Sequence, residues 1–186
     1  MGATALGLRL ARPPWRIAVT SGNASLRMTV LMTPDMANFS GNVHGGSLLE
    51  RLDQVAYACA SRYAGTYVVT LSVDRVLFRD AIHVGELVTF SASVNYTGRT
   101  SMEIGIRVDT ENIRSGTRRH TNSSYFTMVA VDDTGEPVAV PPFTPNTDIT
   151  RDRYEAARLR RRAQYAAFAS PHSVPLDELS ETTRNG

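Results

Sequence analysis

The residues best suited to chemistry lie in a polar stretch that leads into the longest apolar-periodic segment of the chain. Asn42 precedes the pair Gly45-Gly46, and Asp53 follows seven residues after that pair. A glycine pair at the start of a helix leaves free N–H groups at the positive end of the helix dipole. Such a site stabilises an anion, or the oxyanion that forms when a carbonyl is attacked. A tight entry turn alone would explain the two glycines equally well.

Asp53 is the candidate acid–base group. On a helix that begins at the glycine pair it lies about two turns, or ~10 Å, from the helix start. It therefore cannot easily meet Asn42 of its own loop, but it can meet groups from a neighbouring subunit. A carboxylate partly shielded from water suits a general base or a nucleophile. A solvent-facing or ion-paired Asp is the alternative, and His44 is either an acid–base group or a loop residue without a role.

A second candidate site is the turn from Gly98 to Ser101. It combines the Arg99 guanidinium with the hydroxyls of Thr100 and Ser101 and with backbone N–H groups. Arginine and hydroxyl donors suit a phosphate. A plain hairpin turn explains the same residues equally well.

Other chemistries find little support. The single Cys59 excludes an intramolecular disulfide and a multi-cysteine zinc site, and its place on an apolar helix stripe indicates a buried side chain. The four histidines have no metal-ligand spacing, so we expect no metal and no cofactor.

Composition indicates one globular domain with tails. The chain has 186 residues and a net charge of +2, and all twenty basic residues are Arg. These arginines concentrate in residues 1–27 and 151–162. A nucleic-acid binder more often carries its basic residues on one face of a folded domain, so we expect no nucleic-acid partner. No apolar run approaches the ~18 residues that span a bilayer, and the N-terminus is a poor signal peptide, so we expect a cytoplasmic protein that does not enter membranes.

A single helix must position the candidate residues. Apolar residues recur at spacings of three and four up to a stop at Gly65, and they predict a helix with a buried stripe centred near Leu52. Asp53 then lies roughly 90° to the side of that stripe. The stripe consists of Leu48, Leu52, Val55, Ala56, Cys59 and Tyr63.

The remaining periodicity is that of strands. We expect them at about 26–33, 67–78, 87–96, 102–108 and 117–131, joined by short turns as an antiparallel meander. One core helix must serve all of them, so the sheet has to curl around it. This is the α+β hotdog fold, a curled antiparallel sheet of about five strands wrapped around one long helix. Its outer face should remain partly apolar, which predicts self-association.

The expected organisation has three parts. Residues 1–25 form a disordered extension, 26–142 form the folded domain, and 143–186 hold a linker, a C-terminal helix and a disordered tail. The helix should span about 151–168 behind Thr150 as N-cap, and its weak apolar stripe predicts a peripheral position.

An ordered set of motifs carries a family resemblance over roughly residues 26–142. The motifs are Asn42-Val43-His44-Gly45-Gly46, Asp53, Val69–Asp74, Phe78, Ile82–Glu86, Gly98–Ser101 and Phe126–Asp132. With these motifs the chain resembles the hotdog acyl-CoA thioesterases of the YciA type, relatives of the cytosolic acyl-CoA hydrolases and the brown-fat-inducible thioesterases. One departure is Ala81, where the family usually has Pro, and Asp80 beside it adds a negative charge.

The resemblance implies hydrolysis of acyl-CoA to CoA and a free carboxylic acid, in dimers assembled into tetramers or trimers of dimers. Asp53 would act as general base or nucleophile opposite Asn42 of a neighbouring subunit. The backbone N–H of Gly46, with Gly45, would polarise the thioester carbonyl, and Thr70 would line the same pocket. The family would bind CoA at the strand end near Phe78 and at the turn formed by Gly98, Arg99, Thr100 and Ser101.

Two alternative functions are open, one within the same fold and one of a different class. A hotdog dehydratase or hydratase pairs a carboxylate with a histidine earlier in the loop, where this chain has Asn38 and Asn42 instead. A non-catalytic acyl-CoA-binding regulator would need an attached DNA-binding domain, and residues 1–27 are too short and irregular for one.

Overall fold

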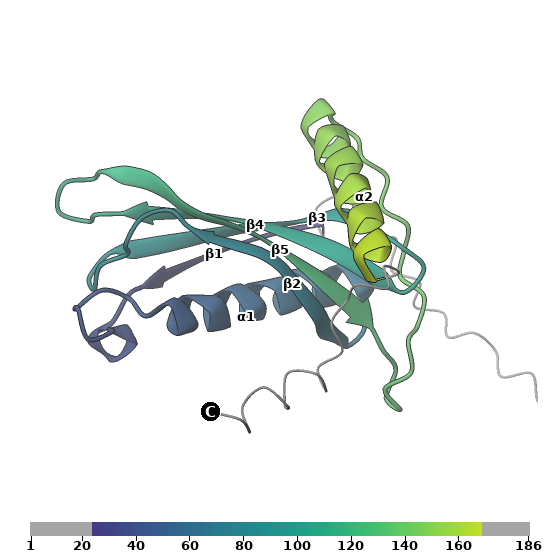
Figure 1. Cartoon of the computed structure of the whole chain (residues 1–186), viewed down its shortest axis with the longest axis horizontal. Helices are drawn as coiled ribbons and strands as arrows, with labels where there is room; N and C mark the ends of the chain where they lie inside the picture. The colour runs from purple at the N-terminus through teal and green to yellow at the C-terminus, as the bar shows by residue number, and fades with distance from the viewer. Residues whose placement is uncertain (1–23, 169–186) are drawn as a thin grey trace, which may run out of the picture.

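The computed structural model describes residues 24–168, in which α1 lies along one face of an antiparallel sheet and α2 rests against the other face (Figure 1). The expected disorder of residues 1–25 and of the C-terminal tail falls outside the described residues, except at Ala24, which is buried, and Ser25, which begins β1. The elements are β1 (Ser25–Leu31), η2 (Pro34–Met36), α1 (Gly45–Ala64), β2 (Val68–Phe78), β3 (Leu87–Thr97), β4 (Ser101–Glu111), β5 (Arg118–Ala130) and α2 (Asp148–Phe168).

The predicted core helix is confirmed as α1. Every residue of the predicted stripe is buried, and Leu52 at its centre is fully enclosed. The helix ends where Gly65 adopts a left-handed conformation with φ of 69° and donates its N–H to the carbonyl of Ser61. Only glycine adopts this conformation without a steric cost, which is why the helix stops here.

The sheet has five strands in the order β1-β3-β4-β5-β2, so the predicted simple meander is wrong at β2. Strands β3, β4 and β5 do follow one another through short turns. β2 instead lies at the edge and pairs with β5, because residues 79–86 carry the chain to the opposite side of the sheet. β2 therefore presents an open edge.

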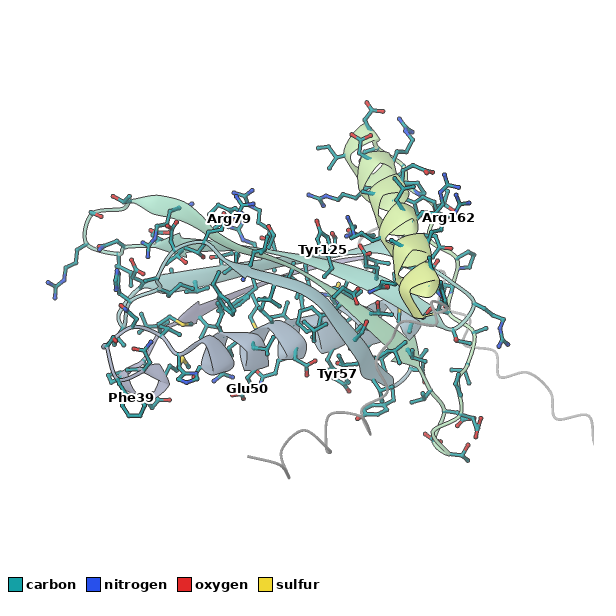
Figure 2. All side chains as sticks on the ribbon, viewed as in Figure 1. Phe39, Glu50, Tyr57, Arg79, Tyr125 and Arg162 are labelled. Carbon is teal, nitrogen blue, oxygen red and sulfur yellow. The ribbon has the colours of Figure 1, made fainter. Side chains whose placement is uncertain are left out.

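The expected partly apolar outer face is confirmed mainly on β2. Most of the exposed large apolar residues of the sheet lie there, at Val69, Leu71, Val73, Leu77 and Phe78, and Leu31 on β1 is a further one. On β3 to β5 the outward side chains are mostly polar. One of them, the Glu103 carboxylate, is buried under α2 and accepts hydrogen bonds from Arg160 at 2.6 and 3.1 Å. The guanidinium of Arg160 also lies 3.8 Å from the ring centre of Tyr125, which rises from the sheet towards α2 in Figure 2.

The C-terminal helix begins at Asp148, three residues before the predicted start. The predicted N-cap was Thr150, but the Thr147 hydroxyl accepts a hydrogen bond from the Thr150 N–H at 3.2 Å. That is the bond by which an N-cap satisfies a free amide of the first turn. Asp148 in the first turn also suits the positive end of the helix dipole.

Truncation of the central core residue tests this packing. Leu52→Ala should lower the free energy of unfolding by about 2–5 kcal/mol, because it removes transfer energy and leaves a cavity under the sheet. Urea unfolding followed by circular dichroism measures the loss. Ile113→Ala is the control, since Ile113 is 54% exposed in the β4–β5 turn and should change stability by about 0.5 kcal/mol or less. Equal unfolding midpoints for the two variants would contradict the assignment of Leu52 to the core.

Candidate active site

Asp53 and Thr70 are brought together by the packing of α1 on the edge strand. The Thr70 hydroxyl donates a hydrogen bond of 2.6 Å to Oδ1 of Asp53. Asp53 stands beside the buried Leu52 and is itself half-buried, as its predicted angle on the helix requires. Thr70 is exposed because β2 has no neighbour on its outer side within the described residues. One oxygen of a carboxylate is thus fixed, at an edge that is open to water.

The polar loop before α1 is folded around two asparagines. Oδ1 of Asn38 accepts the backbone N–H groups of Ser40 at 2.9 Å and Asn42 at 3.1 Å. The Asn38 N–H donates in turn to the carbonyl of Asn42 at 2.7 Å. Phe39, at the tip of this loop, is fully exposed (Figure 2). The side-chain amide N–H groups of Asn38 make no hydrogen bond to the described residues, so they remain available as donors.

Asn42 is engaged differently. Its Oδ1 lies 2.8 Å from Nδ1 of His83, a residue of the segment that follows β2. The backbones of Asn42 and His83 also form an isolated antiparallel bridge. The structure therefore uses the Asn42 side-chain oxygen to join two loops, a role that sequence spacing did not indicate.

An ion pair holds the loop of residues 79–86, which follows β2, in place. Arg119 on β5 makes two hydrogen bonds of 2.7 and 2.8 Å to the buried carboxylate of Glu86 and a third, of 2.6 Å, to the carbonyl of Ala81. The Arg119 hydrogen bond is the main reason that the pKa of Glu86 is lowered, and burial opposes it. The Ala81 position, where the resembling family has Pro, is thus fixed through its carbonyl. Asp80 is exposed beside it.

The N-terminus of α1 is capped by a histidine. Nδ1 of His44 accepts the Gly46 N–H at 2.9 Å. The Gly46 amide, predicted to polarise a carbonyl, is thus already occupied, and it reaches a substrate only when the His44 ring turns away. Sequence reasoning left His44 without a defined role, because His is an uncommon N-cap.

Gly45 and Phe78 meet at the same end of the helix. The Phe78 ring lies 3.7 Å from where a Cβ on Gly45 would stand. A cavity of about 300 Å³ opens here and is lined by residues of both loops and of β2. Asp53 and Thr70 do not line it, and no hydrogen bond links them to Asn38 or Asn42 within the described residues. One chain therefore carries two separate groups of candidate residues, Asp53 with Thr70 and the residues around this cavity, which are called half-sites below. The lining residues are Asn38, Asn42, Val43, Gly45, Leu48, Phe78, Arg79, Asp80, Ala81, Ile82 and Thr121.

The Gly98–Ser101 turn lies away from both half-sites, beneath α2. Gly98 donates its N–H to the carbonyl of Ser101 at 2.8 Å, which closes the turn. Arg99 is exposed, and its carbonyl accepts the N–H of Val140. Thr100 contributes its carbonyl to the N–H of Ala130. The turn is thus a structured hairpin whose side chains face α2 and solvent.

Two further groups bear on the chemistry. Burial raises the pKa of the Cys59 thiol to about 12, so this cysteine is not a nucleophile at neutral pH. Between residues 24 and 168, no three His, Cys, Asp or Glu side chains come together as a possible metal site.

In the same part of the chain, neither helix has the length and apolar character needed to cross a membrane.

Comparison with known proteins gives a consistent picture. The model of the thioesterase superfamily matches residues 40–117. Protein VdlD of Helicobacter pylori is 49% identical over 149 residues, which cover 80% of this chain and 85% of that protein. The cytosolic acyl coenzyme A thioester hydrolase of Rattus norvegicus is 34% identical over 147 residues, and this chain spans 38% of its length.

Solved structures of acyl-CoA thioesterases and hydrolases are also similar to this chain. An apo hexameric acyl-CoA thioesterase superimposes with a TM-score of 0.77 at 36% identity, over 80% of this chain and 96% of that one. The acyl-CoA hydrolase of Staphylococcus aureus, solved with butyryl coenzyme A, has a TM-score of 0.73 at 29% identity, over 79% and 90%. Variants of that hydrolase have been solved in which an Asn, an Asp and a Thr are each replaced by Ala. The Asp lies fifteen residues after the Asn, and the Thr seventeen after the Asp.

Proposed function

Because this chain belongs to the thioesterase superfamily and has its hotdog fold, we propose that it hydrolyses acyl-CoA at a site that two subunits share. The similar proteins of known activity are acyl-CoA thioesterases and acyl-CoA hydrolases, and this chain is an acyl-CoA thioester hydrolase like them. The observation that carries the mechanism is the half-buried Asp53 carboxylate, held by Thr70 at the open edge of the sheet.

In the proposed reaction the Asp53 carboxylate takes a proton from water. The resulting hydroxide attacks the thioester carbonyl, and the oxyanion is stabilised by backbone N–H groups at the start of α1 and by a loop asparagine amide. Collapse of this intermediate expels the CoA thiolate, which takes up the proton, and leaves the carboxylic acid. Thr70 fixes the orientation of the carboxylate. The reaction requires only the two subunits, the thioester and water, so we propose no metal and no cofactor.

The open edge of β2 supports the proposal of a shared site. Its exposed apolar residues, together with Phe39 and Tyr57, form a surface that suits burial against a second copy. Antiparallel pairing of β2 with β2 of that copy would bring the Val68 end of one strand to the Phe78 end of the other. The Phe78 end adjoins the loop of Asn38 and Asn42, and the Val68 end adjoins Asp53. Each dimer would then complete two sites. We propose a dimer as the unit of a larger assembly, by analogy with the hexameric relatives.

The spacing in the Staphylococcus aureus variants bears on which asparagine acts. In this chain Asp53 lies fifteen residues after Asn38 and eleven after Asn42, and Thr70 lies seventeen after Asp53. Asn38, Asp53 and Thr70 therefore reproduce the spacing of the three substituted residues. The Asn42 side-chain oxygen is already bonded to His83, whereas the Asn38 amide N–H groups are available. We accordingly favour Asn38 over Asn42 as the amide that contacts the substrate.

Matched variants separate the two asparagines. Asn38→Ala should lower kcat by about 10²-fold, because it removes a donor to the oxyanion. Asn42→Ala should lower it much less, because its side chain joins loops and does not contact the substrate in this proposal. Release of free thiol from acyl-CoAs of increasing chain length is the assay. A larger loss in Asn42→Ala than in Asn38→Ala would make Asn42 the donor to the oxyanion. A wild-type protein that releases no thiol from any acyl-CoA would refute hydrolysis itself.

The rat relative is named as a cytosolic hydrolase, which supports the cytoplasm as the compartment of this protein. CoA thioesters carry several phosphates and do not cross membranes unaided, so substrate and enzyme would share that compartment.

A further inference from the structure

Arg161 on α2 reaches the Gly98–Ser101 turn from outside the hotdog domain. Its Nη1 donates a hydrogen bond of 2.8 Å to the Ser101 hydroxyl, and its Nη2 lies 3.1 Å from the Tyr165 hydroxyl. Nη2 also lies 2.8 Å from where a Cβ on Gly98 would stand. The guanidinium therefore packs directly against the turn at Gly98, where there is no side chain.

The charge of Arg161 is not neutralised. The neighbouring Arg160 is paired with Glu103, but no carboxylate within residues 24–168 forms an ion pair with Arg161. Arg161 is half-buried, and its guanidinium lies 5.4 and 5.3 Å from the ring centres of Tyr96 and Tyr165. A partly enclosed cation between aromatic rings, with a hydroxyl beside it, is a site that favours an anion.

A cavity of about 240 Å³ opens beside this cation. Its walls come from α2, from the strands on either side of the turn and from the edge strand β2. The β2 residues that contribute, Leu71 and Ser72, directly follow Thr70 in the chain. The cavity thus lies on the strand that carries part of the catalytic half-site. It is lined by Leu71, Ser72, Tyr96, Ser101, Glu103, Thr127, Arg161, Gln164 and Tyr165.

We propose that Arg161 binds a phosphate group of the CoA part of the substrate, so that α2 is a substrate-recognition element of this enzyme. The proposal rests on acyl-CoA hydrolysis as the function. It gives the Arg-rich C-terminal helix a defined role, in which Arg160 anchors the helix to the sheet through Glu103, and Arg161, the next residue, presents the cation to the cavity. Arg99, exposed on the same turn, adds positive charge at the entrance. Because the phosphates lie far from the thioester, Arg161 contributes to binding and not to the chemical step.

The test compares substrates with and without phosphates. Arg161→Ala should raise KM for acyl-CoA about tenfold and leave kcat within about threefold, the pattern of lost uniform binding. The same acyl group on pantetheine, which has no phosphate, should show no change in KM. Acyl-dephospho-CoA, which lacks only the 3′-phosphate, shows which phosphate Arg161 contacts. If Arg161→Ala and wild type have the same KM for this substrate, Arg161 binds the 3′-phosphate. If Arg161→Ala still has the higher KM, Arg161 binds the diphosphate. Arg161→Lys should restore part of the loss, because it keeps the charge without the planar fork.

Arg162→Ala is the matched control, since Arg162 points away from the sheet on the same helix and is exposed (Figure 2). It should leave all three KM values unchanged. If Arg161→Ala impairs all three substrates equally, or none of them, Arg161 does not bind phosphate. Such a result on an enzyme whose wild type hydrolyses acyl-CoA would overturn this inference alone, whereas a wild type inactive on every substrate would overturn the proposed function.

Discussion

Asp53→Asn should lower the turnover of acyl-CoA by about 10²-fold or more, the range expected when a general base is lost. The asparagine keeps the size of the side chain and can still accept the hydrogen bond from Thr70, so the helix and the edge strand should stay packed. What is lost is the carboxylate that takes the proton from water. The measurement is steady-state thiol release, with KM expected to change little because Asp53 acts in the chemical step.

The control for this variant is Asp133→Asn, the same substitution in the exposed turn after β5. It should retain the wild-type rate. Thr70→Ala should fall between the two, because it frees the carboxylate to rotate but leaves its charge. Wild-type turnover of several acyl-CoAs by Asp53→Asn would remove Asp53 from the mechanism, whatever the loop asparagines do.

Mixing two inactive subunits should restore activity. In a mixed dimer of Asp53→Asn and Asn38→Ala subunits, one site carries both substitutions and the other carries neither. Because a twofold dimer has two equivalent sites, such dimers should show about half the wild-type rate per dimer. Co-expression with two different affinity tags and purification over both resins isolates the mixed species for the thiol assay. The gain over either parent is large, since each parent alone should be nearly inactive.

The reverse arrangement supplies the control. When both substitutions are on one subunit and its partner is wild type, each site contains one defect, so the mixed dimer should be nearly inactive. A site complete within one chain predicts the opposite pair of results. It would leave the first mixture inactive and the second about half active, since the wild-type subunit would keep its own site. The two mixtures therefore decide whether the half-sites at Asp53 and Asn38 belong together across the subunit boundary.

Periodicity was sufficient to predict most of the fold. The stripe through Leu52 and the alternation along β3 and β4 report directly which side chains are buried, so the positions of α1, β3 and β4 are predicted within a few residues. The position of β2 was not predictable in this way. Alternation says that a segment is a strand but not which neighbour it pairs with, and the long-range pairing of β2 with β5 depends on the path of residues 79–86.

The site was predictable only in part. The angular position of Asp53 on its helix follows from helix geometry, and the half-buried Asp53 beside the buried Leu52 in the structure confirms it. The roles of His44 and His83 did not follow, because a histidine that caps a helix and a histidine that joins two loops are recognised by three-dimensional contacts alone. Arg161 was hidden for a different reason. It stands among several arginines on one helix, and only the contact with Ser101 and Gly98 distinguishes it.

The strand order also governs how the chain is made. β2 is the second strand to leave the ribosome but pairs within the described chain only with β5, the last one. About forty residues separate the end of β2 from the start of β5, which at usual rates of synthesis is a delay of roughly 2–8 seconds. During that time the apolar residues of β2 have no partner strand, whereas β1, β3 and β4 can already cover part of α1. The nascent chain should therefore be most prone to aggregate through β2 until β5 has been translated.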